Sequence, residues 1–301
     1  MIETVSFDVD AALQRLSDGG RATAAELSAL ATSSDLLPLG MMADAARRRI
    51  NGGDVTFVRV ALVEEPGGHP SPATAASELR IGAGRNATLD EARRTIDMLR
   101  QGGNGRVVSG FSWADVVRWA GPAGSPSSVL ATLMRSGLDA LAEVSIDDGA
   151  DVAPAIETLR GAGAPWIRLT VTKAAAMADR LPQLVRAAEI AERLGGVTTI
   201  APLPMTLDPL RPTTGYDDVK AVALARLALP TVPHVQVDWL RYGPKLAQVA
   251  LTFGADDIDN VTASDDAPDG RRRAPVEELR RNVESAGFRA VERDGRFARL
   301  A

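Results

Sequence analysis

Charged, hydroxyl and aromatic side chains stand inside or directly after apolar, β-branched segments of this 301-residue chain. When such segments form the parallel strands of an α/β barrel, the residues at their carboxyl ends meet at one face and build the ligand site. Arginine at this face can bind an anion, and carboxyl side chains can transfer protons. The candidate ligand-binding residues are Arg59, Glu143, Arg168, Thr170, Asp238, Trp239 and Asp259.

Arg168 lies within the apolar segment 165–171, where an unpaired guanidinium would be costly. We therefore expect it to meet a carboxylate such as Glu143 or an anionic ligand, and structural pairing is the favoured interpretation. Ser109 and Thr170 are of a type that more often packs or bonds to the backbone than contacts a ligand. Glu143 and Asp238 together could perform acid–base chemistry, although no diagnostic spacing accompanies them.

The chain contains no cysteine and two histidines. Disulfides, thiolate nucleophiles and thiolate-bound zinc or iron–sulfur centres are excluded, because each requires sulfur. Glu64, Glu65 and His69 could together hold a metal, but their spacing is not one that a metal site requires, and an exposed loop is the favoured interpretation for His69. We predict no metal site, and a metal bound by Glu64, Glu65 and His69 is the alternative. No G-x-S-x-G motif accompanies any serine.

The charge balance is mildly acidic, with 34 Lys and Arg against 39 Asp and Glu and a net charge of −5. Nucleic-acid binding proteins usually carry clustered basic residues, so no nucleic-acid partner is predicted. No stretch approaches the length of uncharged apolar sequence that spans a membrane, and the first residues are unlike a signal peptide. We expect a cytoplasmic protein without a membrane span.

Hydrophobic periodicity predicts short helices over residues 1–50 and then alternating strands and helices. Strand candidates lie near residues 55, 80, 106, 140, 166, 198, 235 and 258. This count favours a (β/α)₈ TIM-type barrel over a doubly wound open sheet. The second candidate is the weakest, which leaves open a barrel that is incomplete or eroded in strands 1–3. The predicted domains are a helical segment, 1–50, packed on the barrel, and a barrel with a C-terminal helix and tail, 51–301.

Several motifs point to a known family. They are LPL at 37–39, ADAAR at 43–47, VTFVR at 55–59, PTTGYDD at 212–218, HVQ at 234–236, GPKLAQVAL at 243–251 and FGADDID at 253–259. Together they resemble the radical S-adenosylmethionine enzymes of the futalosine route to menaquinone, namely aminofutalosine synthase and cyclic dehypoxanthinyl futalosine synthase, and the related deazaflavin-forming enzymes. The resemblance implies a radical-S-adenosylmethionine-type barrel and covers about residues 35–60 and 200–297.

The chain departs from that family at its chemical centre. Family members carry C-x-x-x-C-x-x-C after the first strand, where three thiolates hold a [4Fe–4S] cluster that binds S-adenosylmethionine. The corresponding segment here, residues 59–69, reads RVALVEEPGGH and offers no thiolate. Without the cluster, the reductive cleavage of S-adenosylmethionine has no electron source. We therefore predict no cluster, no radical reaction and no role for S-adenosylmethionine as cofactor.

Three functions follow from these observations. The leading hypothesis is a cluster-less barrel that binds a futalosine-type metabolite linked to menaquinone biosynthesis, either without catalysis or with a non-radical step. The alternative is a pseudoenzyme that acts as the partner subunit of a cluster-bearing homologue. The third is a non-redox hydrolase or lyase. A small-molecule metabolite is the expected partner, with a cluster-bearing homologue or a second copy of the chain as further partners.

Overall fold

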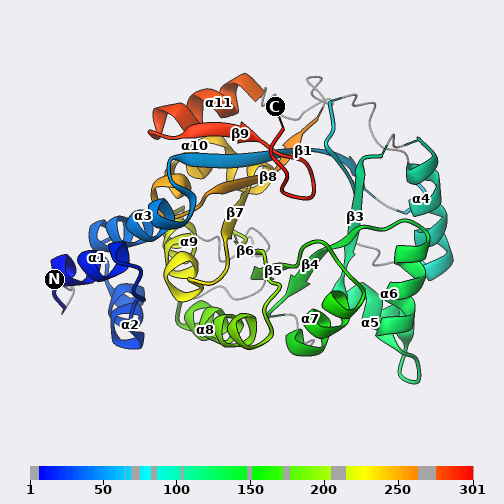
Figure 1. The fold of residues 1–301 in the computed structure, drawn as a ribbon, viewed down its shortest axis with the longest axis horizontal. Coiled ribbons are helices and arrows are strands. Elements are labelled where there is room, and N and C mark those ends of the chain that lie inside the picture. Colours follow the sequence, from blue (N-terminus) through cyan, green and yellow to red (C-terminus); the bar gives the residue numbers. More distant parts are fainter. Residues whose placement is uncertain are drawn as a thin grey trace.

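The computed structural model describes residues 7–64, 66–68, 75–82, 87–102, 105–147, 151–171, 177–204, 215–263 and 276–300. Strands and helices alternate along most of the chain, and a ring of parallel strands is surrounded by the helices (Figure 1). The architecture is thus the predicted (β/α)₈ barrel and not an open doubly wound sheet.

The barrel strands follow one another in the order of the sequence. They are β1 (Asp54–Val63), β2 (Glu78–Ile81), β3 (Val107–Ser112), β4 (Ala140–Ser145), β5 (Arg168–Val171), β6 (Thr199–Pro202), β7 (His234–Asp238) and β8 (Asp257–Thr262). Each strand pairs in parallel with its neighbour, and β1 pairs with both β8 and β2. The ring is therefore closed.

The alternative of a barrel eroded in strands 1–3 is wrong. Strand β2 has only 4 residues, but every one of them pairs with β1 on one side and with β3 on the other. The strand looked weak in the sequence because it is short and carries Glu78 and Arg80. These two side chains alternate with the buried Leu79 and Ile81, as expected for a strand with one polar face.

The helices lie outside the ring. They are α1 (Val9–Ser17), α2 (Ala24–Thr32), α3 (Leu37–Asn51), α4 (Leu89–Gly102), α5 (Trp113–Ala120), α6 (Pro126–Arg135), α7 (Val152–Gly161), α8 (Met177–Leu194), α9 (Gly215–Ala228), α10 (Trp239–Thr252) and α11 (Val276–Ser285). The first two stand to the side of the barrel (Figure 1), where α1 packs on α3 and α2 on α8 and α9. Among the described residues, no helix is both long and apolar enough to cross a membrane.

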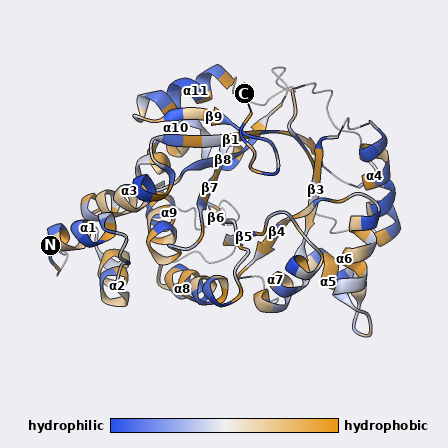
Figure 2. Cartoon of the chain, in the orientation of Figure 1, coloured by the Kyte–Doolittle hydropathy of each residue, from blue (hydrophilic) through white to orange (hydrophobic). Residues whose placement is uncertain are grey.

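Helix α4 shows how local sequence sets these elements. The backbone N–H of Thr88 donates to Glu91 and the N–H of Glu91 donates back to the Thr88 hydroxyl, at 2.8 and 3.2 Å, and together they form a capping box. Ile96 and Leu99 face the core, while the solvent side is polar, so hydrophilic colours prevail on this helix in Figure 2.

The C-terminal segment, predicted only as a tail, contains a further strand. Strand β9 (Arg289–Glu292) pairs in parallel with the first residues of β1. After β9 the chain turns across the amino end of the barrel, where the N–H of Arg293 donates to the carbonyl of Phe57 at 2.9 Å. We call residues 293–300 the tail, and Figure 1 shows it as the red loop beside the ring.

Candidate functional site

The interior of the barrel is polar and charged, although barrel interiors are commonly filled by branched apolar residues. At its centre lies Asp259 of β8, whose side chain is fully buried. Arg80 of β2 binds both of its carboxylate oxygens, at 2.7 and 2.8 Å, and Arg168 of β5 approaches Oδ2 at 3.1 Å. Burial alone would raise the pKa of Asp259, but the two guanidinium groups hold that pKa well below its ordinary value.

A second carboxylate, Glu78 of β2, supports this pair. It accepts hydrogen bonds from Arg80 Nε at 2.8 Å and from the hydroxyl of Ser109. Glu78 is 2% exposed, so its charge is balanced inside the protein by the arginine it shares with Asp259. Arg80 thus pairs with Glu78 of its own strand and with Asp259 of β8, and the second pair connects β2 to β8.

The third carboxylate, Asp257 of β8, connects the barrel to the tail. Arg293 Nε and Nη2 donate to its two oxygens at 2.6 and 2.7 Å. Gln236 donates to Oδ2 at 2.6 Å and Thr56 donates to Oδ1 at 2.5 Å. Burial opposes ionisation of Asp257, but Arg293 lowers its pKa below the ordinary value. The tail therefore carries a cation into the barrel interior.

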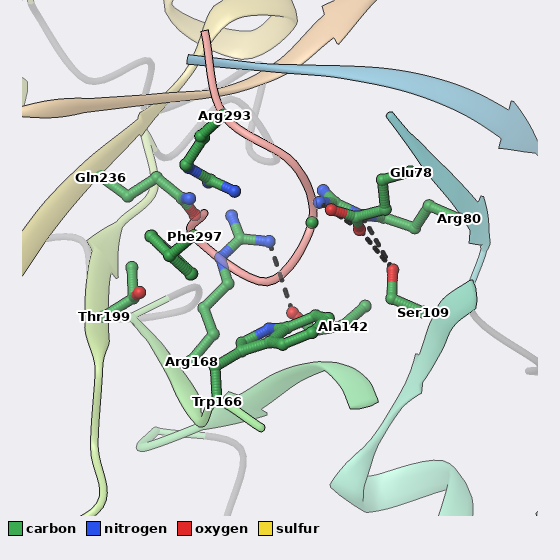
Figure 3. A pocket seen from close by; sticks show the side chains of 11 residues that line it. Glu78, Arg80, Ser109, Ala142, Trp166, Arg168, Thr199, Gln236, Arg293 and Phe297 are labelled. Atoms are coloured by element: carbon green, nitrogen blue, oxygen red, sulfur yellow. Dashed lines mark hydrogen bonds and ion pairs between the residues drawn. The ribbon is translucent and has the colours of Figure 1, made fainter. Parts of the chain in front are cut away.

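A cavity of about 10 Å³ lies between these groups, below the centre of the barrel (Figure 3). Its lining residues are Glu78, Arg80, Ser109, Ala142, Trp166, Arg168, Thr199, Gln236, Arg293, Gly295 and Phe297. Such a volume is close to the minimum for a single water molecule and is far below that of a metabolite site. Gly295 and Phe297 of the tail close this end of the barrel.

Asp238 ends strand β7 and stands beside Asp259 in the β7–β8 register. Its Oδ1 accepts a hydrogen bond from the backbone N–H of Arg241 at 3.0 Å, which caps helix α10. Its Oδ2 accepts one from the side chain of Asn260 at 3.3 Å. Burial, and then the neighbouring charge of Asp259, raise the pKa of Asp238 above its ordinary value.

The structure brings four of the predicted site residues together in the interior: Arg168, Thr170, Asp238 and Asp259. Arg168 meets a carboxylate as expected, but that carboxylate is Asp259, and its other contact is the carbonyl of Ala142 at 3.3 Å, not Glu143. Thr170 follows two residues after Arg168 on the same face of β5 and is fully buried.

The remaining candidates lie elsewhere. Arg59 pairs with Glu292 of β9 at 2.7 Å and so lies on the outer side of β1. Glu143 is half-buried in β4. Trp239 opens helix α10 with its side chain 1% exposed. It packs in the apolar core, and its Nε1 has no hydrogen-bond partner among the described residues.

Five interior residues were not among the predicted site residues: Glu78, Arg80, Gln236, Asp257 and Arg293. A usable signal was present, because Glu78 and Arg80, and likewise Asp257 and Asp259, are spaced by two within strands and must therefore share a face. Arg293 gave no such signal, since it lies beyond the last predicted helix.

No group of three potential metal ligands occurs in the described part of the chain. Glu64 is described and exposed, whereas Glu65 and His69 lie outside the described residues. A [4Fe–4S] cluster held by cysteines does not fit this chain, because the sequence contains no cysteine.

The chain is a (β/α)₈ barrel, and its fold is similar to that of two solved proteins. The structure is similar to methylornithine synthase (PylB), with a TM-score of 0.67 and 10% identity over 93% of this chain and 97% of that one. It is also similar to the FeFe-hydrogenase maturase HydG from Carboxydothermus hydrogenoformans, with a TM-score of 0.68 and 10% identity over 96% of this chain and 80% of that one. These similarities concern the fold alone.

Part of the sequence also matches a protein family and several named relatives. Residues 207–299 match the family described as the CofH/MqnC C-terminal region. The 5-amino-6-(D-ribitylamino)uracil–L-tyrosine 4-hydroxyphenyl transferase of Archaeoglobus fulgidus is 33% identical over 128 residues, which are 38% of this chain and 37% of that protein. The aminodeoxyfutalosine synthase of Streptomyces coelicolor is 30% identical over 139 residues, or 39% and 36% of the two chains.

These matches confirm the resemblance to the radical S-adenosylmethionine enzymes of the futalosine and deazaflavin routes. The chain spans little more than a third of the length of these two relatives. Asp238, Asp257, Asp259 and Arg293 lie within the family match, whereas Glu78, Arg80 and Arg168 lie outside it.

Proposed function

We propose that the protein binds a small polar metabolite of the futalosine or deazaflavin type at the carboxyl end of its barrel and does so without radical chemistry. The names of the relatives supply the ligand class, and the lack of cysteine removes the cluster on which radical chemistry depends. What remains is a barrel with polar groups along its interior, of a kind that can recognise a ligand.

The observation that carries the proposal is the buried hydroxyl of Thr170. Its side chain is fully buried on the inner face of β5, and its Oγ1 has no hydrogen-bond partner among the described residues. A buried hydroxyl without a partner costs free energy, so such groups call for an explanation. A bound ligand that bonds to Thr170 would supply the missing partner.

The closed amino end of the barrel supports the same location. The tail fills that end, and the cavity above it has a volume of only about 10 Å³. A ligand therefore has to enter from the carboxyl ends of the strands, which is where barrels of this fold bind their ligands. Thr170 lies nearer to that end than Arg168 does, and the register of β5 and β6 places Arg168 opposite Thr199.

A matched pair of variants tests the proposal. Thr170→Val removes the hydroxyl with little change of shape, and Thr199→Val does the same one layer lower, beside the closed cavity. Both hydroxyls lack a partner among the described residues, so neither change should lower stability. In a thermal-shift titration with aminodeoxyfutalosine and with 5-amino-6-(D-ribitylamino)uracil, one compound should stabilise the wild type.

Thr170→Val should lose most of that stabilisation, and Thr199→Val should keep it. If neither compound shifts the wild-type transition, the proposed ligand class is wrong. If both variants respond as the wild type does, the ligand does not use Thr170, and this location is refuted. Mass spectrometry of the same mixtures reports whether the bound compound is altered.

A second candidate function is that of partner subunit to a cluster-bearing homologue. It is favoured by exposed apolar side chains one turn apart on α3, Leu37 and Met41, which are 69% and 45% exposed. In this case Leu37→Lys with Met41→Lys should abolish co-elution with a homologue that carries the cysteines, while Thr170→Val should leave co-elution unchanged. Co-elution that survives the lysine substitutions excludes this surface.

A further inference from the structure

Asp238 is a buried carboxyl group at the carboxyl end of β7, and its side chain faces the interior beside the proposed ligand site. It is 5% exposed, and it lies two residues after Gln236, which lines the closed cavity from the same face of β7. Asp238 thus stands nearer the carboxyl end of the barrel than Gln236 does.

The two neighbouring aspartates have very different surroundings. Asp259 has Arg80 and Arg168 within 3.1 Å. Among the described residues, the only guanidinium within ion-pair distance of Asp238 is that of Arg241, at 3.8 Å, and its side chain is 44% exposed. The arginines of the interior therefore neutralise Asp259 and leave Asp238 with little compensation for a negative charge.

The other groups that face Asp238 do not change this balance. Arg168 acts on it from β5 while it is committed to Asp259. Asn260 of β8 and the α10 backbone donate hydrogen bonds to it. Tyr242 of α10 also faces it, but its buried hydroxyl donates to the carbonyl of Pro202 at 2.5 Å. Burial and the charge of Asp259 accordingly raise the pKa of Asp238 above its ordinary value, which favours the neutral carboxyl group.

We infer that Asp238 is an acid–base residue that transfers a proton to the metabolite in this site. The inference rests on the proposed function, and the unpartnered hydroxyl of Thr170 in the same barrel interior is the independent sign of a ligand. The O–H bond of the neutral carboxyl breaks, and the proton forms a new bond with a lone pair of the ligand, at a carbonyl oxygen or a ring nitrogen. The carboxylate that remains pairs with the protonated ligand, and no further reactant is needed.

The alternative is that Asp238 only caps helix α10. Asparagine and serine cap helices about as well as aspartate, so Asp238→Asn and Asp238→Ser keep that role while they remove the acid. Asp115 provides the matched control. It is 5% exposed, lies in the first turn of α5, and pairs with Arg118 three residues later, yet it bonds to Ser112 and not to the interior ion pairs.

Isothermal titration calorimetry in two buffers of different ionisation enthalpy measures the protons taken up on binding. The probes are aminodeoxyfutalosine and 5-amino-6-(D-ribitylamino)uracil, and the titrations are repeated from pH 5 to pH 9. A neutral Asp238 supplies the proton itself, whereas an ionised Asp238 is recharged from the buffer, so uptake by the wild type and by Asp115→Asn should rise with pH from about zero to about one proton per ligand. Asp238→Asn and Asp238→Ser should take up none and bind about tenfold more weakly or worse.

Each other outcome is decisive. Binding by the wild type without proton uptake, or uptake that persists in both Asp238 variants, overturns the role of Asp238 and leaves the proposed function standing. Absence of binding by the wild type overturns the proposed function itself, and the inference with it. Loss of uptake in Asp115→Asn as well would show that any buried carboxyl has this effect, which also contradicts the inference.

Discussion

Replacement of Arg293 by methionine should destabilise the whole barrel, although the residue lies outside every barrel strand. The Arg293 side chain is 2% exposed and donates two hydrogen bonds to Asp257, which is fully buried. Methionine preserves most of the apolar stem but leaves Asp257 with only Thr56 and Gln236 as partners among the described residues. The buried carboxylate then lacks its cation.

Removing one member of a buried ion pair costs about 3 to 5 kcal/mol. Arg293 also lies over the ring of Phe297, 3.8 Å from its centroid, and this contact is lost too, which favours the upper part of that range. With an unfolding entropy of about 2.1 cal/mol/K per residue, a loss of about 4 kcal/mol lowers the Tm of a 301-residue chain by about 6 °C.

Urea unfolding of the wild type, Arg293→Met, Asp257→Asn and the double variant measures this cost. The double variant should be less destabilised than the sum of the single variants, because the neutral amide that replaces the Asp257 carboxylate no longer needs a cation. Hence the free energies should differ from additivity by about 1 kcal/mol or more. A cost below about 1 kcal/mol for Arg293→Met, or strict additivity, would refute the reasoning.

The pH dependence of the free energy of unfolding tests whether the negative charge of Asp257 causes this cost. Because the folded pKa of Asp257 is lowered, its contribution to stability is present above its ordinary value of 3.8 and is lost as the pH falls through the folded value. In Arg293→Met the unpaired carboxyl takes up a proton more readily. The difference between wild type and variant should therefore shrink from about pH 7 to about pH 4.5, and a constant difference would contradict the assignment.

Three further predictions concern single positions. Since the folded pKa of Asp238 is raised, the neutral form is favoured in the folded state, so Asp238→Asn should gain stability relative to the wild type as the pH rises from about 4 to about 8, measured by urea unfolding; an unchanged difference would contradict this. Gly110→Ala should lower the free energy of unfolding by about 1 to 3 kcal/mol, because the new Cβ would lie 2.8 Å from Cβ of Ile81; an unchanged Tm would show that β2 and β3 can move apart. Phe297→Ala should cost about 2 kcal/mol through loss of stacking on His234, with centroids 4.8 Å apart, and should speed amide exchange of the tail; unchanged exchange would show that the ring does not hold it.

The sequence predicted the fold better than the site, and the reason lies in the range of the interactions. Strand and helix positions depend on local patterns, such as the capping box of Thr88 and Glu91 or the β-branched run at Val55 to Val63, so all eight predicted strand positions have counterparts in β1 to β8. Strand β9 escaped prediction because its residues, RAVE, are half polar and its partner is β1, more than 200 residues away in the chain.

The interior ion pairs depend on contacts between distant strands. Arg80 and Asp259 are 179 positions apart, and nothing near either residue specifies the other. The prediction that Arg168 needs a carboxylate rested on the cost of burial, which is local, and it was confirmed in kind. The choice of Glu143 as the partner rested on an assumption about which strands are neighbours. Strand β8 closes the ring, and the carboxylate that meets Arg168 is Asp259 of that strand.

The tail has a consequence for the order in which the molecule is made. During synthesis the chain leaves the ribosome from its amino end, at about 5 to 20 residues per second. Strand β1 and all its barrel partners emerge before Arg293, yet Asp257 waits for that residue as its counterion. Until residues 293–300 have left the ribosome, Asp257 has no arginine to pair with, and Gly295 and Phe297 do not yet cover the amino end of the barrel. The tail can therefore dock onto β1 only after all the barrel strands have been made, and a chain stalled before Arg293 would lack the cation that pairs with Asp257.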